Sequence, residues 1–159
     1  MKKLIMTGLA AALLSSAATA TFAADPSEKA VSARRGFMQV QSFNAGPLFG
    51  MLKGKVPYDA KRAQMLANNL KLISQMSNGA AMWPKNSDNA KPALKGKTRA
   101  LPAIWAAGSD IGSKWGDWRK AVAELAAVAG DGKDALSAKV KALGGTCGAC
   151  HKAFRAKEF

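Results

Sequence analysis

The stretch DALSAKVKALGGTCGACHKAF, residues 134–154, decides the fold. Its apolar side chains and its two cysteines recur at steps of four and three residues: Leu136, Val140, Leu143, Cys147, Cys150 and Phe154. Side chains three and four residues apart lie above one another on one face of an α-helix. The stretch therefore predicts an amphipathic helix that turns both cysteines toward the interior of a helical protein.

Three further segments show a helical repeat. One runs through Ile104, Ile111, Trp115, Trp118, Val122, Leu125 and Ala129. Another, from about Tyr58 to Ser77, carries Ala63, Leu66, Leu70 and Ile73. The third of these segments is the first along the chain. It begins near Ser27, a residue type that caps helices, and ends at about Leu52. Pro47 lies inside this first segment, where we expect it to kink or shorten the helix.

The connections between these segments predict the topology. Gly50 to Pro57 and Gly130-Asp131-Gly132 are short breaks, whereas residues 78–100 are polar, contain Pro84 and Pro92, and are predicted to form a long loop rather than a helix. Short connections place successive helices antiparallel. The sequence therefore predicts an all-α, up-down-up-down antiparallel four-helix bundle, a fold that houses cofactors between its helices.

The N-terminus is typical of an export signal. Lys2 and Lys3 precede an apolar run that extends to about Ala20, followed by small residues. We expect cleavage after Ala23, with Ala18 and Ala20 as an earlier alternative, so that residues 1–23 are a signal peptide and 24–159 form one domain in the periplasm. A membrane anchor is the alternative for this segment, and we expect no further membrane span.

The chain is strongly basic, with 24 Lys and Arg against 10 Asp and Glu. In a cytosolic protein this balance indicates nucleic acid, but an exported protein meets no chromosome. Acidic surfaces of partner proteins or membrane head groups are then the expected partners, and simple solubility is the alternative.

Both cysteines belong to Cys147-Gly148-Ala149-Cys150-His151. The Cys-x-x-Cys-His pattern is the attachment signature of c-type haem, in which each thiol forms a thioether with a haem vinyl group. The adjacent imidazole then reaches the iron from the same helical turn. His151 is the only histidine in the chain, so a bis-histidine site is excluded. We expect one covalent haem c per chain, with His151 as an iron ligand.

Two other uses of the cysteines stay open. An exported Cys-x-x-Cys pair can form a disulfide or a redox site, although a thioredoxin-like site also needs alternating strands and helices. A closed zinc site needs further Cys, His or carboxylate ligands, and none lies nearby in the sequence before Glu158. An unmodified motif would leave a purely structural helical bundle.

The mature chain resembles the class II c-type cytochromes, which include cytochrome c prime. The resemblance rests on Cys147-Gly148-Ala149-Cys150-His151 near the C-terminus, followed by Phe154-Arg155. It also rests on Arg34 with Met38, on Lys53-Gly54-Lys55-Val56-Pro57-Tyr58-Asp59, and on Pro102-Ala103-Ile104-Trp105 at the start of the third helix. The resemblance implies a four-helix bundle with the haem between its helices and His151 as the proximal ligand.

The resemblance also implies haem contacts by several polar residues. Arg155 matches a proximal arginine, although a solvated residue at the helix end is the alternative. Arg34 matches an arginine that contacts the haem and can pair with a propionate. Arg35 and Arg99 match haem-edge positions but depart from the usual residue types, often Gln at the first and acidic at the second. Thr98 belongs to the same edge segment.

Met38 matches the residue that faces the sixth coordination site of the iron. If its thioether binds iron, the resemblance implies a low-spin His/Met electron carrier, which we take as the first reading. If Met38 only packs over the haem, it implies a five-coordinate protein that binds nitric oxide or carbon monoxide. We expect no enzyme activity, because no paired carboxylates or phosphate-binding loop accompany the single histidine.

Two expectations concern partners. Lys91, Lys95, Lys97 and Arg99, together with Lys152, Arg155 and Lys157, can frame the haem edge and attract acidic redox proteins, or they are merely solvated. The resemblance implies an antiparallel dimer through the first two helices, which we expect to be weak and to use Met51, Met65, Leu72 and Met76. Ordinary filling of the core is the alternative for these four side chains. Trp83, Trp105, Trp115 and Trp118 are expected in the core or in dimer contacts.

Overall fold

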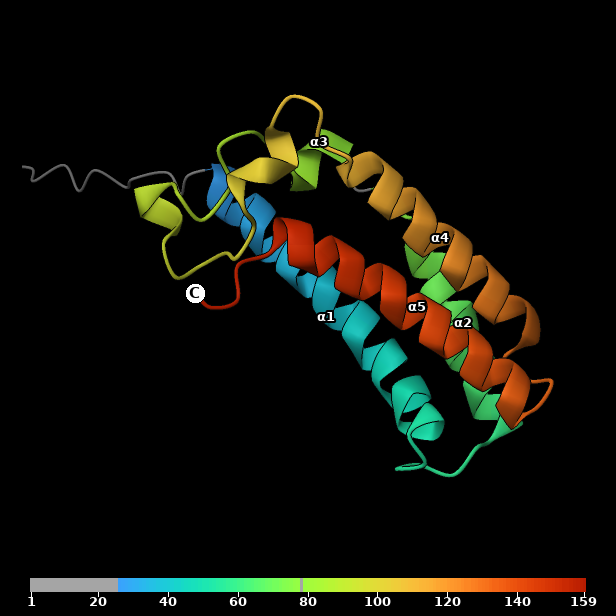
Figure 1. The fold of residues 1–159 in the computed structure, drawn as a ribbon. Helices are drawn as coiled ribbons and strands as arrows, with labels where there is room; N and C mark the ends of the chain where they lie inside the picture. The colour runs from blue at the N-terminus through green and yellow to red at the C-terminus, as the bar shows by residue number, and fades with distance from the viewer. Residues whose placement is uncertain (1–25, 78) are drawn as a thin grey trace, which may run out of the picture.

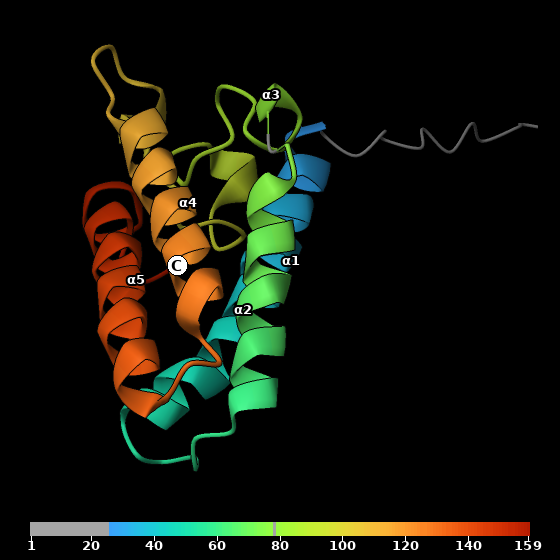
Figure 2. The ribbon, with the colours of Figure 1, turned by 90° about the vertical axis from the view of Figure 1, so that its right-hand side faces the viewer.

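The computed structural model describes residues 26–77 and 79–159. Four long helices dominate it: α1 (Pro26–Leu52), α2 (Ala60–Gln75), α4 (Ile111–Val128) and α5 (Lys133–Phe154). They lie side by side with alternating directions, and α1 packs on α2 and α5 while α4 packs on α2 and α5 (Figures 1 and 2). The predicted four-helix bundle is confirmed.

The core draws side chains from all four long helices. Leu48, Leu70, Val122 and Leu143 come from different helices, and each is at most 1% exposed. Complete burial of such a side chain contributes about 1.5–3 kcal/mol to stability. The stripe predicted for α5 is therefore the face that holds this helix in the bundle.

The first helix ends at Leu52, as predicted. It begins at Pro26, whose fixed φ suits the first helical position, and it continues through Pro47 to Leu52. Pro47 therefore does not shorten the helix, and the alternative expectation, a kink, stays a prediction. The hydrogen bond that Pro47 removes would have ended on the carbonyl of Phe43, whose residue is 80% exposed, so water can take the place of the missing donor.

The segment between α2 and α4, which we call the crossover loop (residues 76–110), contains three short helical turns: α3 (Gly79–Met82), η1 (Pro92–Leu94) and η2 (Pro102–Trp105). Two of these turns, α3 and η1, fall within residues 78–100, so the expectation that this stretch contains no helix is wrong for both of them. The third long helix also starts later than predicted, at Ile111. The η2 segment ends at Trp105, and Gly108, which adopts a φ of 76°, lies in the turn between η2 and α4. The crossover loop lies beside the start of α1 and the end of α5 (Figure 1).

The turn between α4 and α5 is held from outside by Tyr58, which precedes α2. The Tyr58 hydroxyl donates to the carbonyl of Ala129 at 3.1 Å and accepts from the amide of Gly132 at 2.9 Å. These backbone groups at a helix end would otherwise lack intrahelical partners. Tyr58 therefore fixes how α5 leaves the turn.

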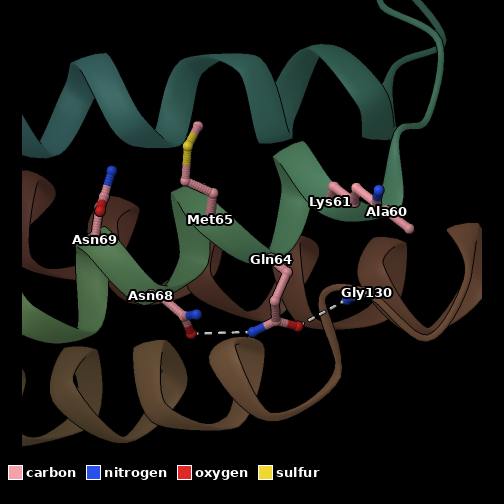
Figure 3. Close-up of a pocket in the computed structure, with 7 residues that line it drawn as sticks. All are labelled: Ala60, Lys61, Gln64, Met65, Asn68, Asn69 and Gly130. Atoms are coloured by element: carbon pink, nitrogen blue, oxygen red, sulfur yellow. Dashed lines mark hydrogen bonds between the residues drawn. The ribbon is translucent and has the colours of Figure 1, made fainter.

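Gln64 supports the same turn. Its side-chain oxygen accepts from the amide of Gly130 at 3.0 Å, and its nitrogen donates to the carbonyl of Ala126 at 2.7 Å. Figure 3 shows Gln64 pointing from α2 toward Gly130, at the edge of a surface groove of about 580 Å³. Because the polar atoms of Gln64 already have protein partners, we assign this groove no ligand.

Exposed apolar side chains occur on α1, on α2 and at the end of α2. Met65, Leu72 and the C-cap residue Met76 are 53%, 65% and 52% exposed, and Val40 and Phe43 on α1 are exposed as well. Met51 is not among them, because it is only 1% exposed and lies in the core. The expectation for Met51 is wrong, whereas the dimer stays a prediction. None of the helices in the described ranges has the length and apolar character needed to cross a membrane.

Candidate functional site

The last helix brings Cys147, Cys150 and His151 to one region of the bundle. All three residues are half-buried, and both thiols are free. Cys147 packs against the central core. The end of α5 is fixed because the amide of Leu101 donates to the carbonyl of Phe154 at 3.0 Å, which ties the helix to the crossover loop. The structure thus places the three predicted groups together on a well-anchored helix.

Burial sets the protonation of these groups. It raises the pKa of the Cys147 and Cys150 thiols, so both stay protonated rather than forming reactive thiolates. The pKa of His151 is lowered, first by burial and then by the nearby cations Arg155 and Arg99. A neutral imidazole keeps the lone pair that binds a metal.

Met38 on α1 lies at nearly the same level of the bundle as His151 on α5. The two helices approach closely at Gly144, where an added Cβ would lie 3.0 Å from the ring of Phe49. From that contact, Met38 is about 16 Å back along α1 and His151 about 10 Å forward along α5 at 1.5 Å per residue. Since the helices are antiparallel, the two side chains differ in level by about 6 Å.

The Met38 side chain is half-buried and packs against the central core. Its sulfur accepts a hydrogen bond from the side-chain nitrogen of Gln41 at 3.6 Å. The preceding Phe37 is buried, and its ring centroid lies 5.9 Å from that of Trp115 on α4. Among the described residues, the Gln41 amide is thus the one side chain with a hydrogen bond to the Met38 sulfur.

Arg34 is 3% exposed and binds the crossover loop. Its Nη1 donates to Ser87 Oγ at 2.7 Å and to the carbonyl of Met82 at 3.4 Å. Its Nη2 donates to the carbonyl of Ser87 and to Thr98 Oγ1 at 2.9 Å. All four Nη hydrogens therefore have protein acceptors. Two of the predicted site residues, Arg34 and Thr98, are in direct contact.

Two tryptophans complete the surroundings of the Arg34 guanidinium. It lies 5.0 Å from the ring centroid of Trp83 and 6.0 Å from that of Trp105. Burial lowers the pKa of Arg34, and the nearby Asp88 carboxylate partly opposes this effect. Arg34 thus joins α1 to both halves of the crossover loop. The expectation of core contacts holds for Trp118, which is 6% exposed, and for Trp115, which packs against the core. Trp83 and Trp105 instead line the contact with Arg34, and dimer contacts stay a prediction.

Arg35 and Arg99 approach each other around the C-terminal residue. Their guanidinium carbons lie 5.3 and 5.2 Å from the ring centroid of Phe159. Arg35 also donates to the carbonyl of Lys97, and Arg99 to that of Lys157, both at 3.1 Å. Arg155 is exposed, and its pKa is lowered first by burial and then by Arg99. The structure therefore gathers the three arginines at the His151 end of the bundle.

Sequence reasoning missed three partners in this region. Gln41 follows Met38 by three residues, a spacing that predicts contact on a helix, so this pair was detectable. Ser87 and Phe159 reach Arg34 and Arg35 from distant parts of the chain. No local pattern in the sequence predicts these two contacts.

A family model described as Cytochrome C' matches residues 29–155. The chain belongs to the cytochrome c' family. The resemblance inferred from the residues is confirmed over almost the whole described chain.

Individual relatives agree with this family. The chain is 36% identical over 149 residues to a cytochrome c' of Cereibacter sphaeroides, covering 94% of this chain and 97% of that protein. It is 33% identical over 131 residues to cytochrome c-554 of Cereibacter sphaeroides, covering 82% and 96%.

Solved structures of cytochromes c' share the fold. Cytochrome c' from Rhodobacter spheriodes has a TM-score of 0.78 at 34% identity, covering 83% of this chain and 98% of that one. Two variants from Alcaligenes xylosoxidans each have a TM-score of 0.69. The carbon monoxide-bound variant is 28% identical and covers 84% of this chain and 98% of its own. The nitric oxide complex is 29% identical and covers 86% and 99%.

The cofactor of this cytochrome c' is covalent haem c, and the residues present fit it. The thiols of Cys147 and Cys150 are free and stand one helical turn apart, beside a neutral imidazole. Ser109 Oγ is buried and has no hydrogen-bond partner among the described residues. Its neighbour Asp110 contributes to the raised pKa of Cys150, which places this segment beside the thiols. A polar atom without a partner here marks a surface that a bound group can cover.

Proposed function

We propose that this cytochrome c' is a periplasmic haem protein with five-coordinate iron that binds nitric oxide or carbon monoxide. One observation carries the proposal: the chain shares its fold with carbon monoxide and nitric oxide complexes of two variants of the Alcaligenes xylosoxidans cytochrome c', over 84% and 86% of its length. Export through residues 1–23, which lie outside the described residues, is part of the proposal.

The residues of α5 hold the cofactor in this proposal. Cys147 and Cys150 are the thioether attachment points, and His151 is the proximal ligand. The haem, when bound, supplies an iron that changes between two oxidation states and accepts small neutral ligands. Burial keeps the His151 imidazole neutral and therefore able to bind iron.

The arginines at the His151 end carry the second part of the proposal. Arg35, Arg99 and Arg155 form a cationic edge that suits haem propionates and acidic redox proteins. The positive charge of Arg155 near His151 also opposes oxidation of a bound iron. Arg34 and Thr98 act behind this edge by holding the crossover loop in place.

A low-spin His/Met electron carrier is the second candidate. It is favoured by one observation, the half-buried Met38 thioether on α1, the helix that packs beside the His151 helix α5. A thioether ligand favours iron(II) and raises the reduction potential. In neither candidate do we assign enzymatic turnover, because the only histidine of the chain is used as a ligand.

Absorption spectra and carbon monoxide titration of the haem-loaded protein test the proposal. We expect high-spin spectra in both oxidation states, carbon monoxide binding to the reduced protein, and little change of spin state in Met38→Leu. A sulfur-to-iron charge-transfer band in the oxidised wild type, lost in Met38→Leu, would establish the second candidate instead. Cys147→Ala with Cys150→Ala serves as the control for covalent attachment, because it removes the thioether-shifted pyridine haemochrome spectrum.

A further inference from the structure

The hydrogen bond between Gln41 and Met38 connects two residues of the same helix. The Gln41 nitrogen lies 3.6 Å from the Met38 sulfur, a separation that suits the large radius of sulfur. The residues are three positions apart and therefore share one face of α1. Since a thioether can only accept, the amide nitrogen must be the group that faces the sulfur.

We infer that Gln41 is a positioning residue that holds the Met38 thioether against α1 and so keeps this sulfur from binding the haem iron. The inference deepens the proposed function and rests on it, because it explains how a methionine near the sixth site is compatible with five-coordinate iron. Gln41, and not Met38 alone, then determines whether the iron is five-coordinate or is also bound by the Met38 sulfur.

The chemistry of the thioether supports this role. Met has three rotatable side-chain bonds and adapts readily to its surroundings, so without a restraint its sulfur can swing toward α5. A hydrogen bond from Gln41 restrains that rotation and withdraws electron density from the lone pair that it uses. Both effects weaken the sulfur as a ligand of iron.

Gln41 is the described residue that restrains the Met38 sulfur by a hydrogen bond. The buried Phe37 on the preceding position packs beside Trp115, and neither side chain has a described hydrogen bond to the Met38 sulfur. The only hydrogen bond described for the Met38 sulfur comes from Gln41. Gln41 is uncharged, so the restraint does not change with pH in the physiological range.

Two substitutions remove the donor in different ways. Gln41→Leu removes the polar group, whereas Gln41→Glu keeps the size of the side chain and replaces the donor by a carboxylate that only accepts. The matched control is Gln39→Leu, because Gln39 is an exposed glutamine on the same helix. All variants are studied as full-length, haem-loaded protein, and far-ultraviolet circular dichroism verifies that they fold.

We expect both Gln41 variants to gain a low-spin fraction with a sulfur-to-iron charge-transfer band. Their carbon monoxide affinity should fall about fivefold, the equilibrium effect of one ordinary hydrogen bond, while Gln39→Leu matches the wild type. In a Met38→Leu background the Gln41 substitutions should change neither readout, because the sulfur is absent.

Three outcomes would overturn the inference. If the Gln41 variants keep the spin state and carbon monoxide affinity of the wild type, Gln41 does not control the sulfur, and the proposed function is unaffected. If the Gln41 substitutions change the spin state and carbon monoxide affinity equally in the Met38→Leu background, their effect does not depend on the Met38 sulfur. If the wild type is itself low-spin through Met38, both the inference and the five-coordinate proposal are wrong.

Discussion

Replacing Arg34 by methionine tests the contact between α1 and the crossover loop. The substitution keeps most of the length of the side chain but removes its charge and every donor. It breaks the hydrogen bonds to Ser87 and Thr98 and the contacts with the rings of Trp83 and Trp105. Arg34→Met therefore removes the group that joins both halves of the loop to the bundle.

The structure gives the size of the effect. Hydrogen bonds from a charged donor contribute about 1.5–3 kcal/mol each, and two of those from Arg34 are short, at 2.7 and 2.9 Å. Removal of the buried charge recovers part of its desolvation cost, which is visible in the lowered pKa of Arg34. The 8%-exposed Asp88 meanwhile loses its nearby cation. We expect a net loss of about 2–4 kcal/mol of unfolding free energy.

Thermal unfolding of the haem-loaded protein measures this loss. At about 4 °C per kcal/mol for a domain of this size, Tm should fall by about 8–16 °C. Arg35→Met is the matched control, because Arg35 is exposed and donates only one described hydrogen bond, so it should cost less than about 1 kcal/mol. Equal Tm values for Arg34→Met and Arg35→Met would refute the structural role of Arg34.

Three other predictions follow from the fold. Tyr58→Phe should lower the unfolding free energy in urea by about 1–2 kcal/mol, because both turn groups bound by the hydroxyl lose their partner; an unchanged midpoint would contradict this. Leu72→Glu should abolish self-association in sedimentation experiments without changing Tm, whereas a monomeric wild type at high micromolar concentration would exclude the dimer. The hydrogen bond from Lys139 lowers the pKa of Glu124, so Glu124→Gln should destabilise the protein slightly at neutral pH. That difference should vanish in acid, as protonation through the lowered pKa removes the stabilisation in the wild type.

The helices could be predicted because their signal is local. In α5 the spacing of three and four positions between apolar residues predicts which side chains face the core. The structure buries Leu136, Val140, Leu143 and Phe154 of this set. The start of α4 was misplaced because Ile104 fits the same repeat as Ile111, although Gly108 between them adopts a positive φ. A repeat alone does not show where the backbone leaves the helix.

The haem-binding residues could be predicted from the sequence, but the contacts that hold the surrounding loop in place could not. Cys147, Cys150 and His151 are adjacent in the sequence, so their spacing reports their function directly. The partners of Arg34 lie 53 and 64 positions away in Ser87 and Thr98, and only the folded bundle brings them together. Local patterns carry no information about such long-range contacts.

The C-terminal residues have a practical consequence for protein engineering. Beyond α5 the chain pairs with the crossover loop, since Arg155 forms a bridge with Ala100 and the amide of Ala156 donates to the carbonyl of Arg99 at 2.8 Å. The ring of Phe159 then lies against two guanidinium groups. An affinity tag fused directly after Phe159 would therefore start beside the cationic edge, and an acidic epitope there would compete with anionic partners. A flexible neutral spacer should precede any such fusion used in binding studies.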